Sequence, residues 1–174
     1  MSSILNRILW GRDPDKPNPM SGLTPRDIYA VQRSWAVMYA EAGKYGLELF
    51  IRLFRLNPVT KTYFRTIKDM NEEQLSKSFQ FKAHAINLMS SINTAVTNLN
   101  QPEVVIALMN KLGETHKKRR VEKSHFEDVK AVLVDILRND LKLTDDVISS
   151  WAKFVTFIYK HIFDVLDDKQ ISNE

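Results

Sequence analysis

Two histidines, His84 and His116, are the residues of this chain best suited to metal chemistry. Each lies on a stretch with apolar residues at helical spacing, and 32 positions (116 − 84) separate them. A neutral imidazole nitrogen binds transition metals, including iron. A single histidine on such a face is more often a core residue than a ligand, so the pair gains meaning only from the elements that place it.

Those elements are predicted to be helices. Thr24 with Pro25 and Asp27 is a start signal: Thr caps, Pro suits the first helical position and Asp suits the positive end of the dipole. The other expected helices are residues 44–57, a short turn from Pro58 to Phe64, one long helix after the Asn71–Gln74 cap, residues 102–118, a helix with a Ser124–Glu127 capping box, and a last helix from Thr144. No stretch alternates with a period of two, so the sequence predicts an all-α fold.

The chain is expected to hold one main domain, because 174 residues can bury a sizeable core without staples. Residues 11–22 contain three prolines and two glycines and are typical of a linker. We therefore expect an N-terminal extension over residues 1–21, the domain over 22–168 and a tail over 169–174. The apolar start is too short for a signal peptide, so a cytoplasmic location is expected.

Composition argues against several other classes of protein. The absence of cysteine rules out disulfides, thiolate ligands and a thiol nucleophile. The formal charge of +4 owes much to the basic run at residues 117–120, which is more typical of a solvated helix end than of a nucleic-acid site. No apolar run is long enough to span a bilayer. The sequence also lacks a His-Glu-x-x-His zinc motif, a phosphate-binding glycine loop and a nucleophile elbow.

A wider set of residues, in register with the two histidines, resembles the globin family over residues 22–168. The matching positions are Trp35, Gly46, residues 50–54, Pro58, Phe64, His84, Leu88, Leu112, His116, Val121, Phe126, residues 151–154, Ile158 and Tyr159. The chain is most similar to insect intracellular globins and to globins of the cytoglobin and neuroglobin type. One departure is that Phe64 lies 20 positions (84 − 64) before His84, one fewer than in myoglobin-like chains.

The resemblance implies a globin fold of seven to eight helices around a haem pocket, with close helix packing at Gly46. It implies haem b (iron protoporphyrin IX), with His116 as the proximal iron ligand and a hydrogen bond from its other nitrogen to the carbonyl of Leu112. His84 would be the distal residue, able to donate a hydrogen bond to O₂ or to bind the iron itself. Other cofactor-binding positions would be Phe50, Phe64, Arg65, Leu88, Leu112, Arg120, Val121, Phe126 and Val129.

The implied function is reversible O₂ binding for storage, delivery or buffering, and the protein is not expected to be primarily an enzyme. Alternatives at the same haem are nitric oxide dioxygenation, nitrite reduction, and redox or oxygen sensing. A haem-free interaction domain is a third class, which the paired histidines argue against. The expected ligands are O₂, CO and NO, a reductase is a possible partner, no nucleic acid is expected, and the protein would be a monomer or homodimer.

Overall fold

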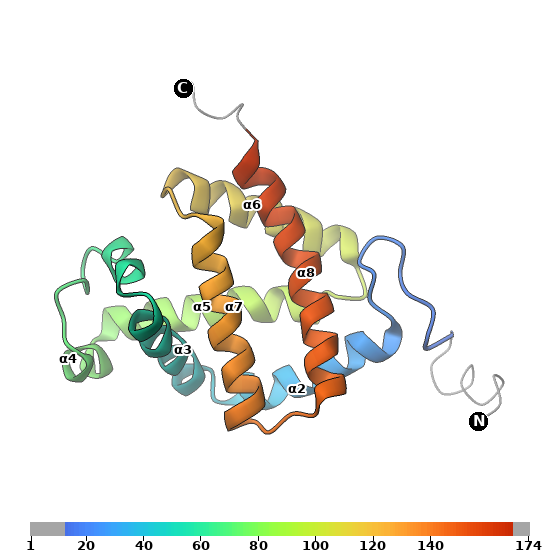
Figure 1. The fold of residues 1–174 in the computed structure, drawn as a ribbon, viewed down its shortest axis with the longest axis horizontal. Coiled ribbons are helices and arrows are strands. Elements are labelled where there is room, and N and C mark those ends of the chain that lie inside the picture. Colours follow the sequence, from blue (N-terminus) through green and yellow to red (C-terminus); the bar gives the residue numbers. More distant parts are fainter. Residues whose placement is uncertain (1–12, 169–174) are drawn as a thin grey trace.

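The computed structural model describes residues 13–168, and this part of the chain forms helices and no strand (Figure 1). The all-α prediction is therefore confirmed. The elements are α2 (Pro25–Ala40), α3 (Ala42–Leu56), η1 (Pro58–Tyr63), α4 (Glu72–Lys77), α5 (Phe79–Thr97), α6 (Pro102–Lys118), α7 (Lys123–Asp135), η2 (Ile136–Asp140) and α8 (Asp145–Asp167). None of these helices is long and apolar enough to cross a membrane.

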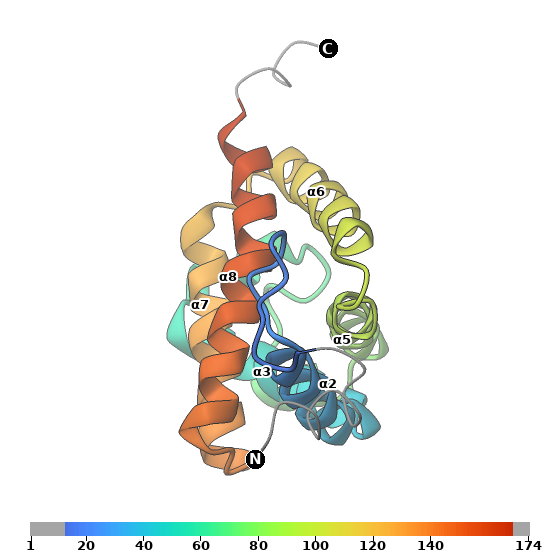
Figure 2. The same cartoon turned by 90° about the vertical axis from the view of Figure 1, so that its right-hand side faces the viewer.

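The helices pack in crossed pairs around one core. Helix α6 packs on α8, α3 packs on α5, and α2 contacts both α5 and α8. Helices α7 and α8 lie side by side in both views (Figures 1 and 2). The largest fully buried side chains include Trp35, Trp151, Phe81 and Phe154, so aromatic rings fill much of the centre.

Two glycines allow the closest helix crossings. A Cβ atom on Gly46 of α3 would lie 2.8 Å from the carbonyl oxygen of Ala85 and 2.9 Å from Cγ of Met89, both on α5. A Cβ on Gly113 of α6 would lie 2.9 Å from Cβ of Val165 on α8. Since α5 and α6 carry the two candidate histidines, these glycines help to set how closely both helices approach their neighbours.

We predict that Gly46→Ala destabilises the protein by roughly 1–3 kcal/mol, because the added methyl group meets a backbone carbonyl that cannot rotate away. The matched control is Gly43→Ala on the same helix, where the nearest atom is Cε of Lys82 at 3.9 Å. Urea unfolding followed by circular dichroism measures both. Equal stability of the two variants would contradict the close crossing.

A buried ionic network fixes the start of α2. Thr24 and Asp27 form a capping box, which confirms the predicted start. Asp27 is 5% exposed and accepts from Lys153 at 2.9 Å and from Ser150 at 2.9 Å, both on α8. Burial alone would raise the pKa of Asp27, but the hydrogen bonds from Thr24, Lys153 and Ser150 lower it below its ordinary value. The carboxylate therefore stays ionised and ties α2 to α8.

We predict that Asp27→Asn costs about 1–3 kcal/mol at neutral pH, because Lys153 and the cap lose a charged acceptor. Since the folded-state pKa is lowered, the carboxylate's contribution is present above about pH 4 and is lost as the pH falls through the lowered pKa. The stability gap between wild type and Asp27→Asn should narrow in acid. The control Asp164→Asn removes an exposed ion pair with Lys160 and should change stability little. A gap that is constant down to pH 3 would contradict the prediction.

Two predicted helix starts were wrong. The Asn71–Gln74 capping box begins only the short helix α4, and a second cap at Ser78, whose Oγ accepts from the N–H of Phe81, begins α5. Two cap residues seven positions apart divide what the apolar spacing presents as one helix.

Helix α7 begins at Lys123, with Glu122 and His125 as the reciprocal caps rather than Ser124 and Glu127. The imidazole Nδ1 of His125 accepts from the N–H of Glu122 at 3.0 Å, a role that the sequence pattern assigns to Glu or Gln.

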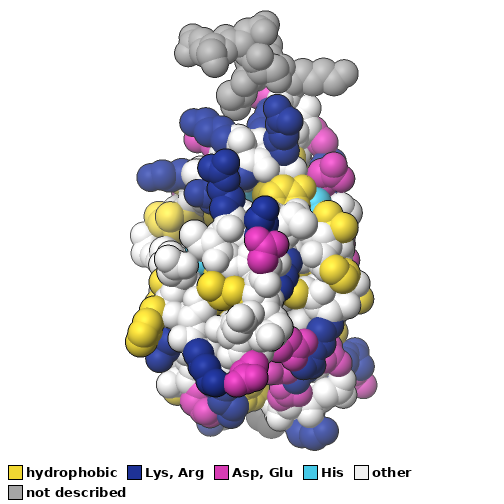
Figure 3. Space-filling view, turned by 90° about the vertical axis from the view of Figure 1, so that its left-hand side faces the viewer, with side chains coloured by type: hydrophobic (Ala, Val, Ile, Leu, Met, Phe, Trp, Pro, Cys, Tyr) yellow, Lys and Arg dark blue, Asp and Glu magenta, His cyan; other side chains and the backbone are white. Residues whose placement is uncertain are grey.

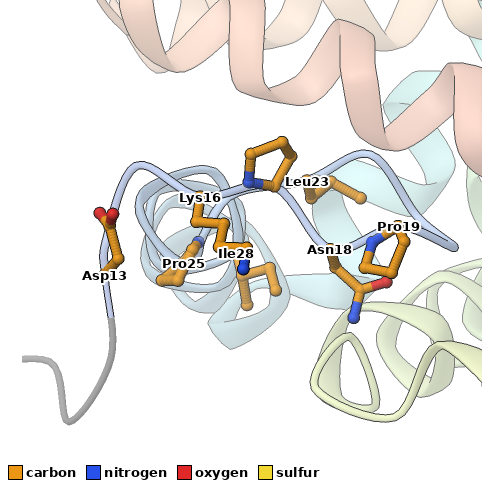
Figure 4. A pocket seen from close by; sticks show the side chains of 8 residues that line it. Asp13, Lys16, Asn18, Pro19, Leu23, Pro25 and Ile28 are labelled. Carbon is orange, nitrogen blue, oxygen red and sulfur yellow. The ribbon is translucent and has the colours of Figure 1, made fainter.

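Residues 13–23 pack against the start of α2. Asp15 pairs with Arg26 at 2.6 Å, Asn18 donates its N–H to the carbonyl of Leu23, and Leu23 is fully buried. A small pocket of about 200 Å³ lies between this segment and α2. Leu23 of the segment and Pro25 and Ile28 of α2 are among the residues that line it (Figure 4). The apolar start of the chain lies outside the described residues.

If the chain binds the haem that the resemblance implies, we predict that deleting residues 2–20 leaves the haem absorption unchanged, because the contacts described above join residues 13–20 to the start of α2. The loss of packing on Leu23 should still lower thermal stability modestly. The Soret band and the melting temperature of the truncated protein measure both effects. Loss of the Soret band would mean that the extension supports the candidate site.

Candidate functional site

His116 lies on the last turn of α6, and its ring is fixed by one backbone contact. Its Nδ1 lies 2.9 Å from the carbonyl oxygen of Leu112, one turn earlier, as the sequence predicts. A carbonyl oxygen only accepts, so Nδ1 carries the proton and Nε2 keeps its lone pair. This arrangement leaves one nitrogen of His116 available to a metal.

The electrostatic surroundings of His116 keep it neutral. Burial lowers its pKa, the hydrogen bond to Leu112 opposes this, and the positive charge of Arg119 lowers the pKa further. The net shift is downward, so the imidazole is unprotonated at neutral pH. A metal-binding histidine has to be in this neutral form.

Residues of α7 and α8 support the other side of His116. The ring of Phe126 lies 5.2 Å from the His116 ring, and the hydroxyl of Tyr159 donates to the carbonyl of Phe126 at 2.5 Å. Tyr159 is buried, and burial raises its pKa, so the hydroxyl remains a donor. The N–H of Val121 donates to the carbonyl of His116 at 3.1 Å and holds the turn after α6.

His84 lies in the first half of α5 and is partly buried. The rings of His84 and of Phe64, the residue after η1, form a T-shaped pair with centroids 5.3 Å apart and planes at 75°. The first half of α5 and the end of α6 lie on the same side of the molecule, the left-hand side of Figure 1. The fold thus brings the neighbourhoods of both histidines to one end of the bundle.

Several apolar residues next to the two histidines are only partly buried. Each of them packs against the core yet keeps some exposed surface; they are Phe64, Leu88, Leu112, Val121 and Val129. Phe50 and Phe126 are more deeply buried, at 7% and 9% exposed. An apolar surface that the protein itself does not fully cover is what a flat, largely apolar cofactor would need.

Arg65 and Arg120, the two cations among the expected cofactor-binding positions, are both exposed. The hydroxyl of Tyr63 donates to the carbonyl of Arg120 at 3.2 Å, which joins the turn before Arg65 to the turn after α6. Figure 3, which views the left-hand side of Figure 1, shows Lys and Arg side chains gathered in the upper part of that face. The exposed side chains of Arg65 and Arg120 are accessible to an anionic group at the surface.

Two residues that support the site were not among the expected cofactor-binding positions. Phe54 ends the globin-like stretch 50–54 and contacts the ring of Phe64, and Phe81 on α5 contacts the ring of Phe50. The four-residue spacing of Phe50 and Phe54 places them on one face of α3. Their meeting with Phe81 depends on the α3–α5 crossing, which the spacing alone does not predict.

The described residues contain no group of three or more His, Cys, Asp or Glu side chains that could hold a metal ion.

Comparison with known proteins identifies relatives of this chain and agrees with its all-helical fold. Cytoglobin-2 of Danio rerio is 34% identical over 152 residues, covering 85% of this chain and 83% of the relative. An anaerobic nitrite reductase of Brassica napus is 30% identical over 135 residues, covering 75% of this chain and 83% of the relative. The solved structure of the hexa-coordinate hemoglobin of Drosophila melanogaster superimposes with a TM-score of 0.79 at 24% identity, covering 84% of this chain and 97% of that one.

The family model named Globin matches residues 47–162, a span that includes both His84 and His116. Since the match extends over more than half of the chain and agrees with the observed fold, the chain belongs to the globin family.

Proposed function

We propose that this globin binds one haem b and reversibly binds O₂. Globins bind haem, and the observation that carries the assignment here is the hydrogen bond from His116 to Leu112. It orients a neutral imidazole with a free Nε2 on an apolar, partly open surface. This is the form that an axial haem ligand needs.

The donor set fits haem better than it fits a bare metal ion. Haem supplies an iron with four in-plane nitrogens, so the protein has to provide only one or two axial ligands. His116 and His84 provide that number, and the described residues offer no larger cluster of metal-binding side chains. In this proposal His116 is the proximal ligand.

His84 is the proposed distal residue. It donates a hydrogen bond to O₂ held in the pocket, and it ligates the iron when no external ligand is present. Phe50 has no hydroxyl group and is 7% exposed, so the polarity of the distal side depends on His84. The proposed lining consists of Phe50, Phe64, Leu88, Leu112, Val121, Phe126 and Val129, with Arg65 and Arg120 pairing with the propionates.

A redox enzyme is the second candidate function, because one relative is named an anaerobic nitrite reductase. Nitrite reduction, nitric oxide dioxygenation or redox sensing would use the same two histidines. These reactions need a partner that returns electrons to the iron, so a reductase is the partner that this candidate requires. We further propose CO and NO as ligands, a cytoplasmic location and a monomeric or homodimeric state.

An absorption spectrum of protein purified from cells tests haem binding. A Soret band is expected, and its absence after reconstitution with haem would overturn the proposal. Rates of O₂ dissociation and autoxidation then separate the two candidates. Slow autoxidation supports O₂ storage or delivery, whereas rapid oxidation with fast turnover of nitrite or nitric oxide supports the enzyme.

A further inference from the structure

Phe64, whose ring forms a T-shaped pair with that of His84, contacts two other phenylalanines. Its ring centroid lies 5.2 Å from Phe50, with the planes at 81°, and 5.6 Å from Phe54, with the planes at 64°. Phe81 completes the set at 5.8 Å from Phe50 and 5.9 Å from Phe54. We call Phe50, Phe54, Phe64 and Phe81 the phenylalanine cluster.

The phenylalanine cluster joins the three segments that meet beside His84. Phe50 and Phe54 come from α3, Phe64 follows η1, and Phe81 lies on α5 three residues before His84. Phe81 is fully buried and Phe54 is 8% exposed, whereas Phe64 is only partly buried. Phe64, the partly buried member of the cluster, is therefore held by the buried rings of Phe50 and Phe54.

This arrangement restricts the ring of His84. T-shaped pairs have a preferred geometry, so a Phe64 ring held by Phe50 and Phe54 limits the orientations open to the imidazole beside it. Phe64 begins the irregular segment between η1 and α4, and such segments are generally more mobile than helices. Phe81 on α5 packs on Phe50 and Phe54 and so supports the two rings that hold Phe64.

We propose that Phe54 and Phe81 are positioning residues for the distal imidazole of His84: Phe54 holds Phe64 directly, and Phe81 does so through Phe50 and Phe54. The inference rests on the proposed haem function and deepens it. Neither ring is assigned to the pocket lining. Each acts on ligand chemistry through the orientation of His84.

The expected effect follows from the strength of aromatic pairs. Phe54→Leu removes the T-shaped contact with Phe64, and Phe81→Leu removes the tilted contacts that support Phe50 and Phe54, so both let Phe64 and His84 sample more orientations. The fraction of His84 in its working position then falls by roughly two- to tenfold, the factor that corresponds to the energy of one aromatic pair. O₂ dissociation should speed up by that factor, because the hydrogen-bond donor is placed less often.

The experiment measures O₂ dissociation and CO binding by flash photolysis in the haem-loaded full chain. The rate of O₂ dissociation measures the hydrogen bond that His84 donates, whether the ferrous protein is five- or six-coordinate. The rate of CO binding measures how strongly His84 competes with CO for the iron. Phe54→Tyr keeps the ring and should retain the wild-type rates. The matched control is Phe154→Leu, a fully buried ring on α8 that contacts Trp151 and lies outside the phenylalanine cluster.

A double-mutant comparison distinguishes positioning from general loosening. In the His84→Leu background, Phe54→Leu and Phe81→Leu should have no further effect on either rate, because the residue that they position is gone. The same acceleration in both backgrounds would overturn the proposal, as would wild-type rates in the single variants or equal acceleration by Phe154→Leu. If one of these contradicting results is found in protein with a normal Soret band, the positioning role alone is rejected. If the wild-type protein has no Soret band, the haem assignment is overturned as well.

Discussion

The His116→Ala variant should lose its haem. The hydrogen bond to Leu112 orients the only proposed proximal ligand, and no other histidine follows it on α6. Loss of an outer partner of a metal ligand already weakens metal binding by about 10–100-fold, so loss of the ligand itself should exceed that range. Gel filtration followed by the ratio of Soret to protein absorbance measures haem retention.

The control for this loss is His161→Ala. His161 lies on α8, and its ring forms a T-shaped pair with that of Phe157. It should retain haem fully. If His116→Ala also keeps haem with an unchanged spectrum, His116 is not the proximal ligand and the proposed site is wrong. Because bound haem stabilises the folded state, the variant should also melt at a lower temperature than wild type.

The His84→Leu variant should bind CO faster and release O₂ faster than wild type. The first change follows because an external ligand no longer has to displace the imidazole from the iron. With an open fraction of about one tenth, the apparent affinity of wild type is about tenfold below the intrinsic value, and the variant recovers that factor. The second change follows because Phe50 cannot replace the lost hydrogen-bond donor, which should shorten the lifetime of O₂ by about tenfold.

Laser photolysis of the CO complex and stopped-flow displacement of O₂ measure these two rates. Leu88→Ala, one turn further along α5, is the matched control, because it enlarges the same wall without removing an imidazole. If Leu88→Ala reproduces both changes, the effect comes from space in the pocket. If His84→Leu changes neither rate, His84 is not the distal residue.

Helix starts show what the sequence could and could not predict. The pattern of Thr24, Pro25 and Asp27 is a local signal, so the start of α2 was predictable residue by residue. The break at Ser78 was not, because Asn71 and Ser78 are both acceptable caps and tertiary packing decides that both are used. His125 as a reciprocal cap carries no recognised signal, since its role depends on which ring nitrogen is unprotonated.

The candidate site divides in the same way. The resemblance to globins implied the hydrogen bond of His116 to Leu112, and the four-residue spacing on one helix allows the two groups to meet. The contact of Phe64 with His84 joins an irregular segment to a helix and was not predicted, although the resemblance to globins implied that both residues lie at the cofactor site. The roles of Phe54 and Phe81 depend on the α3–α5 crossing at Gly46, which requires the three-dimensional structure.

The most direct test of the central claim is the visible absorption spectrum of the ferrous, ligand-free protein. The claim is that His116 and His84 both serve as axial ligands of one haem. It predicts a Soret band together with two resolved visible bands of a six-coordinate iron, which should change to one broad band in His84→Leu. A single broad visible band in wild type, unchanged in His84→Leu, would contradict it.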